Sequence, residues 1–323
     1  MQMFVQNAGI VMRQLLMLYT IVAAGIAAER LGWFSEKTAK RCTQLLLYVV
    51  APCIIIRSFW VMEYSPEILR NLGIALLGGL LLHGTGMAIS WHLYRGKKQP
   101  ETDPILHFAS TYGNTGYMGL PLAQAMVGDI GVFYVSIVVL VFQTFAFTHG
   151  MFIMAGGAVR RRETGKVKFR WKKLFVNPAL IAVAIGFPLY LLRVPVPELI
   201  SWPVNTIAAM NTPLAMMMFG TFLSRTKFNG ILRNKKIFLT GAIKLFAMPA
   251  MLMTVLLLLG VRGPLLHALM IPASVAPANS TVVFAANFER DAGYAAQVVA
   301  LLSMVSIITM PLMIAMALSI AGM

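Results

Sequence analysis

The stretch Gly113-Asn114-Thr115-Gly116-Tyr117-Met118-Gly119-Leu120-Pro121 interrupts an apolar segment that runs from residue 104 to residue 127. Proline removes a backbone donor and clashes with the preceding turn of a helix, and glycine leaves helical dihedral angles at little steric cost. A plain loop here would leave apolar pieces of about nine residues on each side, too short to span a bilayer. We therefore predict a membrane helix broken at its centre, with Gly113, Gly116, Gly119 and Pro121 as break residues.

A second stretch of this kind, Pro272-Ala273-Ser274-Val275-Ala276-Pro277-Ala278-Asn279-Ser280-Thr281, lies within the apolar segment 265–288, with Pro277 as its break residue. Freed backbone groups cost several kcal/mol each in hydrocarbon unless they are buried in protein or line a wet cavity. Each stretch alone is compatible with an ordinary kinked helix that packs closely through its small residues. Two such stretches favour a site that holds something polar.

The composition places both breaks in a membrane protein. Of the 323 residues 59% are hydrophobic and 12% are charged, whereas a soluble chain has about 25% charged residues. We predict an all-α polytopic membrane protein whose ten segments are long enough to span a bilayer. No basic region precedes the first segment, so it is not expected to be a signal peptide. The ten segments are 9–28, 42–60, 69–94, 104–127, 130–156, 174–192, 202–223, 237–259, 265–288 and 294–320.

The basic residues predict the orientation of these segments. The connections after the odd-numbered segments contain 21 of the 27 Lys and Arg residues, and cytoplasmic loops collect Lys and Arg. Both termini should therefore lie on the non-cytoplasmic side of the cytoplasmic membrane. The net charge of +16 is then an orientation signal whose contact is anionic membrane lipid. Nucleic-acid binding is not expected, because no stacking motif accompanies the basic runs.

The basic connection 159–173 divides the chain into two halves, 1–158 and 174–323, of five segments each. An odd number of spans per half means that the second half enters the membrane inverted. Asp129 and Asp291, each before the last segment of its half, are 162 residues apart, and Pro52 and Pro213 are 161 apart. Inverted repeats with broken helices at the midplane are typical of secondary transporters.

These motifs resemble those of the auxin efflux carrier family and, more broadly, the fold that it shares with bile acid:sodium symporters. Besides the first break, the resemblance rests on Thr212-Pro213-Leu214-Ala215, Ala276-Pro277-Ala278 and Ser306-Ile307-Ile308-Thr309-Met310-Pro311-Leu312. It implies ten helices in a 5+5 inverted repeat, with broken helices 4 and 9 crossing at the substrate site. It also implies a fixed scaffold of helices 1, 2, 6 and 7 that forms a homodimer, and six helices that move as an elevator.

The side chains beside the breaks predict the kind of substrate. They are neutral hydrogen-bonding groups, and no carboxylate lies well inside any segment. Half-helix N-termini attract anions, so we expect a small organic anion, a mono- or dicarboxylate; the resemblance adds malonate and malate as examples. No cofactor or metal is expected. Ser110 is one of the neutral side chains beside the first break. The candidate substrate-binding residues are Thr111, Asn114, Thr115, Asn211, Asn279, Ser280, Thr281 and Lys244.

Several charged or titratable residues within the segments have two interpretations. Lys244 lies about seven residues inside segment 237–259; its stem can snorkel to the interface, or its charge can contact an anion or form a gate. Snorkelling is the expectation for Arg13 and Arg57. The four histidines in or near the segments can be packing groups or can carry protons; they are His83, His107, His149 and His267.

Three other functions compete with an organic-anion carrier. A sodium-coupled symporter of the same fold is the nearest alternative, because carbonyls at the breaks could bind Na⁺. A membrane enzyme is disfavoured, because no serine–histidine–acid set, pair of in-membrane carboxylates or metal motif is present. A channel would differ in passing single-channel currents and a non-saturating flux.

Overall fold

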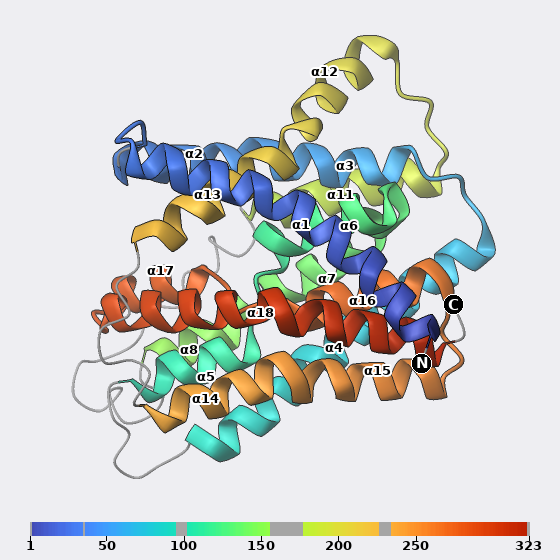
Figure 1. The fold of residues 1–323 in the computed structure, drawn as a ribbon. Helices are drawn as coiled ribbons and strands as arrows, with labels where there is room; N and C mark the ends of the chain where they lie inside the picture. Colours follow the sequence, from blue (N-terminus) through green and yellow to red (C-terminus); the bar gives the residue numbers. More distant parts are fainter. Residues whose placement is uncertain (1, 35, 95–101, 156–176, 226–233, 322–323) are drawn as a thin grey trace.

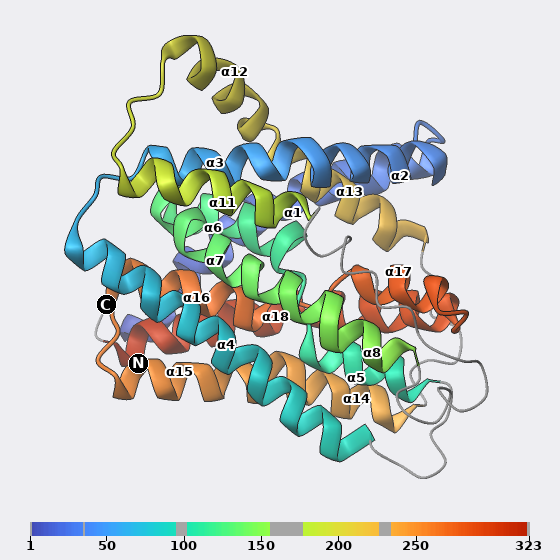
Figure 2. The ribbon, with the colours of Figure 1, turned by 180° about the vertical axis from the view of Figure 1, so that it is seen from behind.

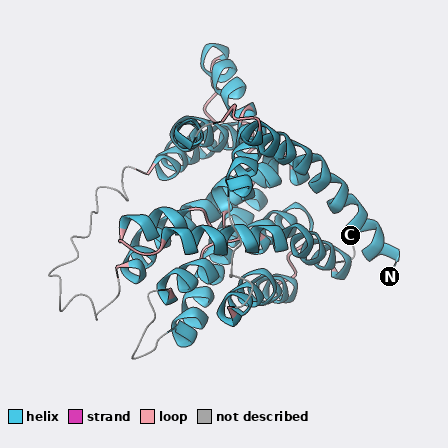
Figure 3. Ribbon diagram, turned by 60° about the vertical axis from the view of Figure 1, so that its left-hand side comes forward, coloured by secondary structure: helices cyan, strands magenta, loops and turns pink. Residues whose placement is uncertain are grey.

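The computed structural model describes residues 2–34, 36–94, 102–155, 177–225 and 234–321. In these parts of the chain all named elements are helical, and seven helical segments are long and apolar enough to cross a membrane. Figure 3 shows helices joined by loops. This is the expected outcome in hydrocarbon, where a helix satisfies its backbone groups within one segment. The chain is a polytopic membrane protein.

The elements of the first half begin near the N-terminus and include three π-helical turns. In chain order they are α1 (Gln2–Arg30), α2 (Glu36–Leu45), the π-turn η1 (Leu46–Val50), α3 (Ala51–Trp60), α4 (Pro66–Tyr94), α5 (Asp103–Thr111), the π-turn η2 (Thr115–Gly119), α6 (Leu120–Val127), α7 (Asp129–Phe145), the π-turn η3 (Ala146–Gly150) and α8 (Met151–Met154).

The described part of the second half is also helical and includes a π-turn. Its elements are α11 (Pro178–Leu191), α12 (Glu198–Ala209), α13 (Asn211–Arg225), α14 (Lys235–Ala242), the π-turn η5 (Ile243–Ala247), α15 (Met248–Leu258), α16 (Gly263–Ser274), α17 (Ser280–Asn287) and α18 (Ala292–Ile320). The predicted basic connection 159–173 lies outside the described residues.

The predicted segments appear in three forms. The first, second, third, fifth, seventh, eighth and tenth correspond to the seven long apolar segments. The sixth corresponds to the 14-residue helix α11. The fourth and ninth are each divided between shorter helices, α5 with η2 and α6, and α16 with α17. The count of ten spans and the 5+5 repeat remain predictions.

The helices lie in two groups in Figures 1 and 2. One group contains α1, α2, α3, α11, α12 and α13, where α1 packs along α13 and α11 along α3. The other contains α4, α5 and α14 to α18, while α6 and α7 lie between the groups. Helix α12 projects from the first group, and the helical assignment is interrupted at Met210 before α13 begins.

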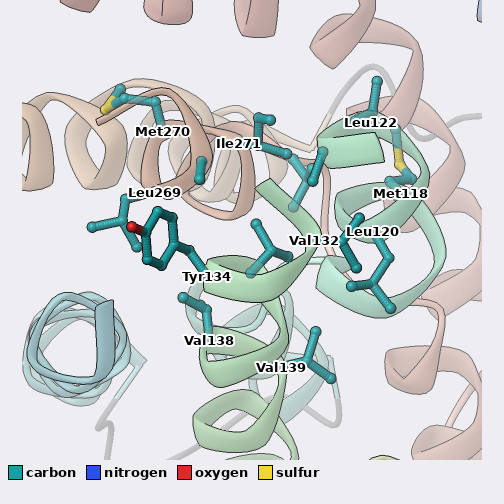
Figure 4. Close-up of a cluster of buried hydrophobic side chains, with 14 of the residues drawn as sticks. Met118, Leu120, Leu122, Val132, Tyr134, Val138, Val139, Leu269, Met270 and Ile271 are labelled. Carbon is teal, nitrogen blue, oxygen red and sulfur yellow. The ribbon is translucent and has the colours of Figure 1, made fainter. Parts of the chain in front are cut away.

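The interior between the groups is filled by buried aliphatic side chains. Figure 4 shows Met118, Leu120 and Leu122 from η2 and α6 on one side of α7, and Leu269 and Ile271 of α16 along another side of it. All five are at most 2% exposed. Inside a bilayer this contact stabilises through van der Waals packing rather than through removal of surface from water. Helix α7 thus holds parts of both broken segments in place.

Candidate functional site at the two helix breaks

The two interrupted segments meet at their interruptions. Helix α5 ends at Thr111 and the helical path resumes at Thr115, while α16 ends at Ser274 and α17 begins at Ser280. Gly113 and Pro277 form an isolated antiparallel bridge. The Asn114 amide donates to the Ala276 carbonyl at 2.8 Å, and the Ala278 amide donates to the Tyr112 carbonyl at 2.9 Å. Backbone groups that each break frees are satisfied by the other break, as membrane depth demands.

Local residue chemistry explains where the helices stop. Pro277 disfavours helical geometry at the residue before it, and the chain is already extended at Val275 (φ −66°, ψ 152°). Gly113 is required by a close approach: a Cβ placed on it would lie 2.8 Å from Lys244 Nζ and 3.0 Å from Val275 Cγ2. The bridge therefore depends on a glycine on one strand and a proline on the other.

The other three predicted break residues lie beyond the bridge. Gly116 and Gly119 belong to the π-turn η2, and no heavy atom lies within 4 Å of a Cβ placed on Gly116. Pro121 directly follows the π-turn, at the second residue of α6, where it has no N–H to donate to the preceding turn. These residues therefore shape the return to helix rather than the interruption itself.

Lys244 lies at this junction and does not snorkel to the interface. Its residue is 1% exposed, and Nζ donates to the Ala273 carbonyl at 3.1 Å. The C-terminal ends of α5 and α16 meet here, and helix C-termini carry partial negative charge. That charge gives the ammonium a favourable place inside the protein, which a sequence-based argument about helix depth does not reveal.

No carboxylate neutralises Lys244 in the described part of the chain. Ion pairs in that part join Arg57 to Asp129, Arg225 to Glu29, and Lys236 to Asp103, and none of these three includes Lys244. A buried charge without a counter-charge is costly. Intramembrane ionisable residues of this kind mark substrate or ion sites.

Several buried polar atoms in or beside the predicted sequence motifs have no hydrogen-bond partner within the described part of the chain. Buried polar groups normally have one, and each that lacks a partner costs about 1–3 kcal/mol. Ser274 and Thr309 belong to this set although they are not among the predicted binding residues; Ser274 lies in the second break stretch, and Thr309 in the motif of the last segment. The atoms are Asn114 Nδ2, both side-chain atoms of Asn211, Ser274 Oγ, Ser280 Oγ, Thr281 Oγ1 and Thr309 Oγ1.

Other side chains beside the breaks have different surroundings. The Thr111 hydroxyl lies 2.9 Å from the His107 carbonyl and 3.2 Å from Ser90 Oγ, and Ser110 Oγ lies 2.7 Å from the same Ser90 Oγ. Both residues are thus engaged with α4. Thr115 Oγ1 lies 3.4 Å from the Gly113 carbonyl. Asn279 is the N-cap of α17, but its side chain makes no capping bond.

The charges of the helix ends define what the junction can hold. Two C-terminal ends, those of α5 and α16, face the Lys244 ammonium. Two N-terminal ends, those of the η2–α6 segment and of α17, begin immediately after the bridge. The partial negative charge of the two C-terminal ends offsets only part of the lysine charge, so the two N-termini, Lys244 and the Asn114 amide together favour a small anion.

Two further features lie away from the junction. Arg57, expected to snorkel, forms a two-pronged ion pair with Asp129, in which Nη2 donates to Oδ2 at 3.0 Å. A surface pocket of about 630 Å³ lies between the end of α3, the end of α11 and α12, and is lined by residues that include Tyr64, Tyr190, Arg193 and Asn205. The Arg193 guanidinium lies 4.4 Å from the centre of the Tyr64 ring.

Sequence comparison covers nearly the whole chain, both breaks included. The profile of the family described as membrane transport protein matches residues 10–314. An uncharacterized transporter of Methanocaldococcus jannaschii is 25% identical over 295 residues, which are 85% of this chain and 89% of the archaeal protein.

Proposed function

The chain belongs to the membrane transport protein family, the family of the auxin efflux carriers, and from this premise we propose that it is a secondary transporter of a small organic anion. The substrate is a mono- or dicarboxylate, carried across the cytoplasmic membrane. The site lies where broken helices 4 and 9 of a 5+5 inverted repeat cross. The protein is a transporter rather than an enzyme.

The observation that carries this proposal is the buried ammonium of Lys244 at the junction of the breaks. It has a carbonyl partner, Ala273, but no carboxylate among the described ion pairs. A bound carboxylate supplies the missing negative charge, and Asn114 Nδ2 offers it an unused donor. Charge-assisted hydrogen bonds of this kind are about twice as strong as neutral ones.

The same ammonium disfavours the sodium-coupled alternative. Carbonyls at the junction are the groups that would bind Na⁺, and Lys244 Nζ already donates to one of them, that of Ala273. A second cation beside it would be repelled, strongly so at low dielectric. Lys244 therefore places a positive charge at this end of α16, where a sodium-coupled transporter would bind Na⁺.

The division of the helices supports an elevator mechanism. The predicted scaffold spans 1, 2, 6 and 7 correspond to α1, α2–α3, α11 and α12–α13, which lie together in one group. Helices α5 and α16, which end at the bridge, belong to the other group. Lys244 lies on η5, between α14 and α15 of that same group. A rigid displacement of the second group would carry the site across the membrane. The scaffold group is where we place the homodimer contact.

The first test is anion binding by the purified protein. We expect malate, malonate or another carboxylate from a panel to raise the midpoint of thermal unfolding, since a ligand at a hundredfold excess over Kd stabilises by about 2.7 kcal/mol. The shift should persist without Na⁺. K244M and N114A should abolish it, whereas K235M, which removes an exposed lysine from the same helical segment, should retain it.

Transport by the protein in liposomes completes the test. Labelled carboxylate should enter in a saturable manner with wild-type protein and K235M, and not with K244M. K244M should remain folded, because methionine fills a similar volume without a buried charge. A wild-type protein that neither binds nor moves any anion of the panel would refute the proposal.

A further inference from the structure

A cluster of titratable side chains adjoins the first break. It consists of His83 on α4, His107 on α5, Tyr112 directly after the end of α5, and His149 on η3. The His107 and His149 ring centres are 5.5 Å apart, and those of His83 and Tyr112 are 5.9 Å apart. We call these four residues the histidine–tyrosine cluster. Among the described residues no group of three or more His, Cys, Asp or Glu is placed to hold a metal ion.

The hydrogen bonds of Tyr112 allow two arrangements of one proton. Its hydroxyl oxygen lies 2.8 Å from His149 Nδ1 and 3.1 Å from the Phe145 carbonyl oxygen. The hydroxyl has one hydrogen, which it can donate either to an unprotonated Nδ1 or to the carbonyl. When Nδ1 carries a proton, Nδ1–H donates to the tyrosine oxygen and the hydroxyl donates to Phe145. The tyrosine oxygen and His149 Nδ1 thus keep their hydrogen bonds when Nδ1 carries a proton.

Tyr112 connects this proton to the candidate anion site. Its side chain bonds to His149, and its backbone carbonyl accepts the hydrogen bond from the Ala278 amide that joins the two breaks. The next residue, Gly113, is the one against which the Lys244 ammonium lies. A change at His149 therefore reaches the bridge through a single residue.

The histidine–tyrosine cluster also approaches one end of the helices. His149 is half-buried, and it lies in a π-helical turn, a feature frequent at functional sites. The ring of Tyr94, near the end of α4, stacks on His107 with centres 6.1 Å apart. Asp103 lies one turn before His107, where it pairs with Lys236. Titratable side chains therefore extend from this end of the helices to the histidine–tyrosine cluster.

Other charged or titratable groups lie around the cluster on the neighbouring elements. On α8, the Met154 carbonyl accepts a hydrogen bond from Arg290 Nε, beyond the end of α17. Tyr294 of α18 bonds to Asn234, and Lys244 acts electrostatically on His83. Of the described groups, the histidines are those whose ordinary pKa lies closest to neutrality.

We infer that His149 and Tyr112 form a proton-binding site, and that anion transport is coupled to a proton carried there; this inference rests on the proposed function. Uptake converts neutral imidazole to imidazolium by forming one N–H bond at Nδ1, and the Tyr112 hydroxyl hydrogen turns from His149 to Phe145. Release reverses both changes. No other bond is made or broken.

The test uses proteoliposomes and the labelled carboxylate that the wild-type protein transports. A pH of 5.5 on one side and 6.5 on the other permits about tenfold accumulation of a monoanion that moves with one proton. We expect accumulation by wild-type protein, and only equilibration by H149Q and Y112F. Both variants should retain the thermal shift and the exchange of bound anion, since neither removes Lys244 or Asn114.

H92Q is the matched control, because His92 is an exposed histidine on α4 whose Nδ1 bonds to the Ala88 carbonyl of its own helix. It should accumulate anion as the wild-type protein does. Equal uptake with and without the gradient, or accumulation by H149Q, would overturn the inference while leaving the proposed function intact. Absence of any anion transport would instead refute the proposed function.

A second measurement is independent of transport. In protein with isotope-labelled histidine rings, the resonance lost in H149Q should shift as the pH is lowered from about 8 to about 4, and this response should differ in Y112F. A resonance that stays unchanged over this range, or that ignores the Tyr112 hydroxyl, would contradict a proton site at His149 whatever the substrate is.

Discussion

At the scale of single residues, the junction depends on the fit between Gly113 and Lys244. The ammonium lies where a side chain at residue 113 would begin, 2.8 Å from the position of a Cβ. Lys244 Nζ is the end of a long side chain rather than backbone, so an added methyl group at residue 113 can displace it. The absence of a side chain at Gly113 therefore serves the placement of a charge.

We predict that G113A keeps the protein folded but moves the Lys244 ammonium away from the bridge. Carboxylate binding should weaken by about tenfold, which corresponds to about 1.4 kcal/mol, while the midpoint of thermal unfolding without ligand changes little. Titration of the thermal shift with malonate or malate measures the effect. G73A is the control, because no heavy atom lies within 4 Å of a Cβ placed on that exposed glycine. Wild-type affinity in G113A would contradict this fit.

At the scale of elements, α1 and α13 approach through glycines. A Cβ on Gly25 would lie 2.2 Å from the Met217 carbonyl oxygen, and one on Gly220 would lie 2.1 Å from the Val22 carbonyl oxygen. Small residues of this kind let membrane helices pack closely. The Arg225–Glu29 pair joins the same two helices, with Nη2 2.7 Å from Oε2. These contacts make a rigid unit, as a scaffold requires.

We predict that G220A lowers the free energy of unfolding by about 1–3 kcal/mol, the usual cost of overpacking. The obstacle is backbone, which moves only if the helices separate. Thermal unfolding in detergent measures the loss, and the same G73A protein serves as the reference. A G220A protein as stable as wild type would show that α1 and α13 do not pack in this way.

The two basic residues beside the junction are also related at this scale. His83 on α4 and Lys244 on η5 are 161 residues apart, the same separation as Pro52 and Pro213. Both are 1% exposed. The proposed inverted repeat thus places a titratable group at the same position of the third and the eighth span; the His83 ring centre lies 5.9 Å from that of Tyr112, and Lys244 Nζ lies beside Gly113.

At the scale of the whole molecule, the Arg57–Asp129 pair connects the first helical group to α7, which lies between the two groups. Arg57 lies on α3, in the group with α1 and α13, and Asp129 begins α7, which packs against α4 and α16. An elevator displacement would separate these residues. The pair therefore favours the arrangement that the structure describes over any displaced one.

We predict that R57A shifts the equilibrium between arrangements by about 1 kcal/mol, a factor of about five. The shift can be measured with the natural thiol of Cys53, which lies one turn from Arg57 on α3. In a C42S background, the quantity measured is the rate at which Cys53 reacts with a membrane-impermeant maleimide. The rate should change in R57A, return in the charge-swapped pair R57D/D129R, and stay unchanged in the control R13A. An unchanged rate in R57A would contradict the prediction that the Arg57–Asp129 pair favours the described arrangement over a displaced one.

The amino-acid sequence by itself determined the environment and the class of the protein. Apolar segments of spanning length, the sign of the charges between them, and the proline and glycine at residues 277 and 113 are local properties, and local properties can be read along a chain. They were enough to predict an all-helical transporter and two interruptions that leave backbone groups to be satisfied.

The tertiary structure alone decided what those interruptions face. Depth along a helix did not tell whether Lys244 points to the interface or inward, because the answer depends on the helix ends of α5 and α16, which are distant in the chain. In the same way, Thr111 appeared equivalent to Asn114 in the sequence, yet its hydroxyl contacts α4. The Tyr112–His149 contact joins residues 37 positions apart. Hydrogen bonds and charges act through space, so their partners become known only when the segments are packed.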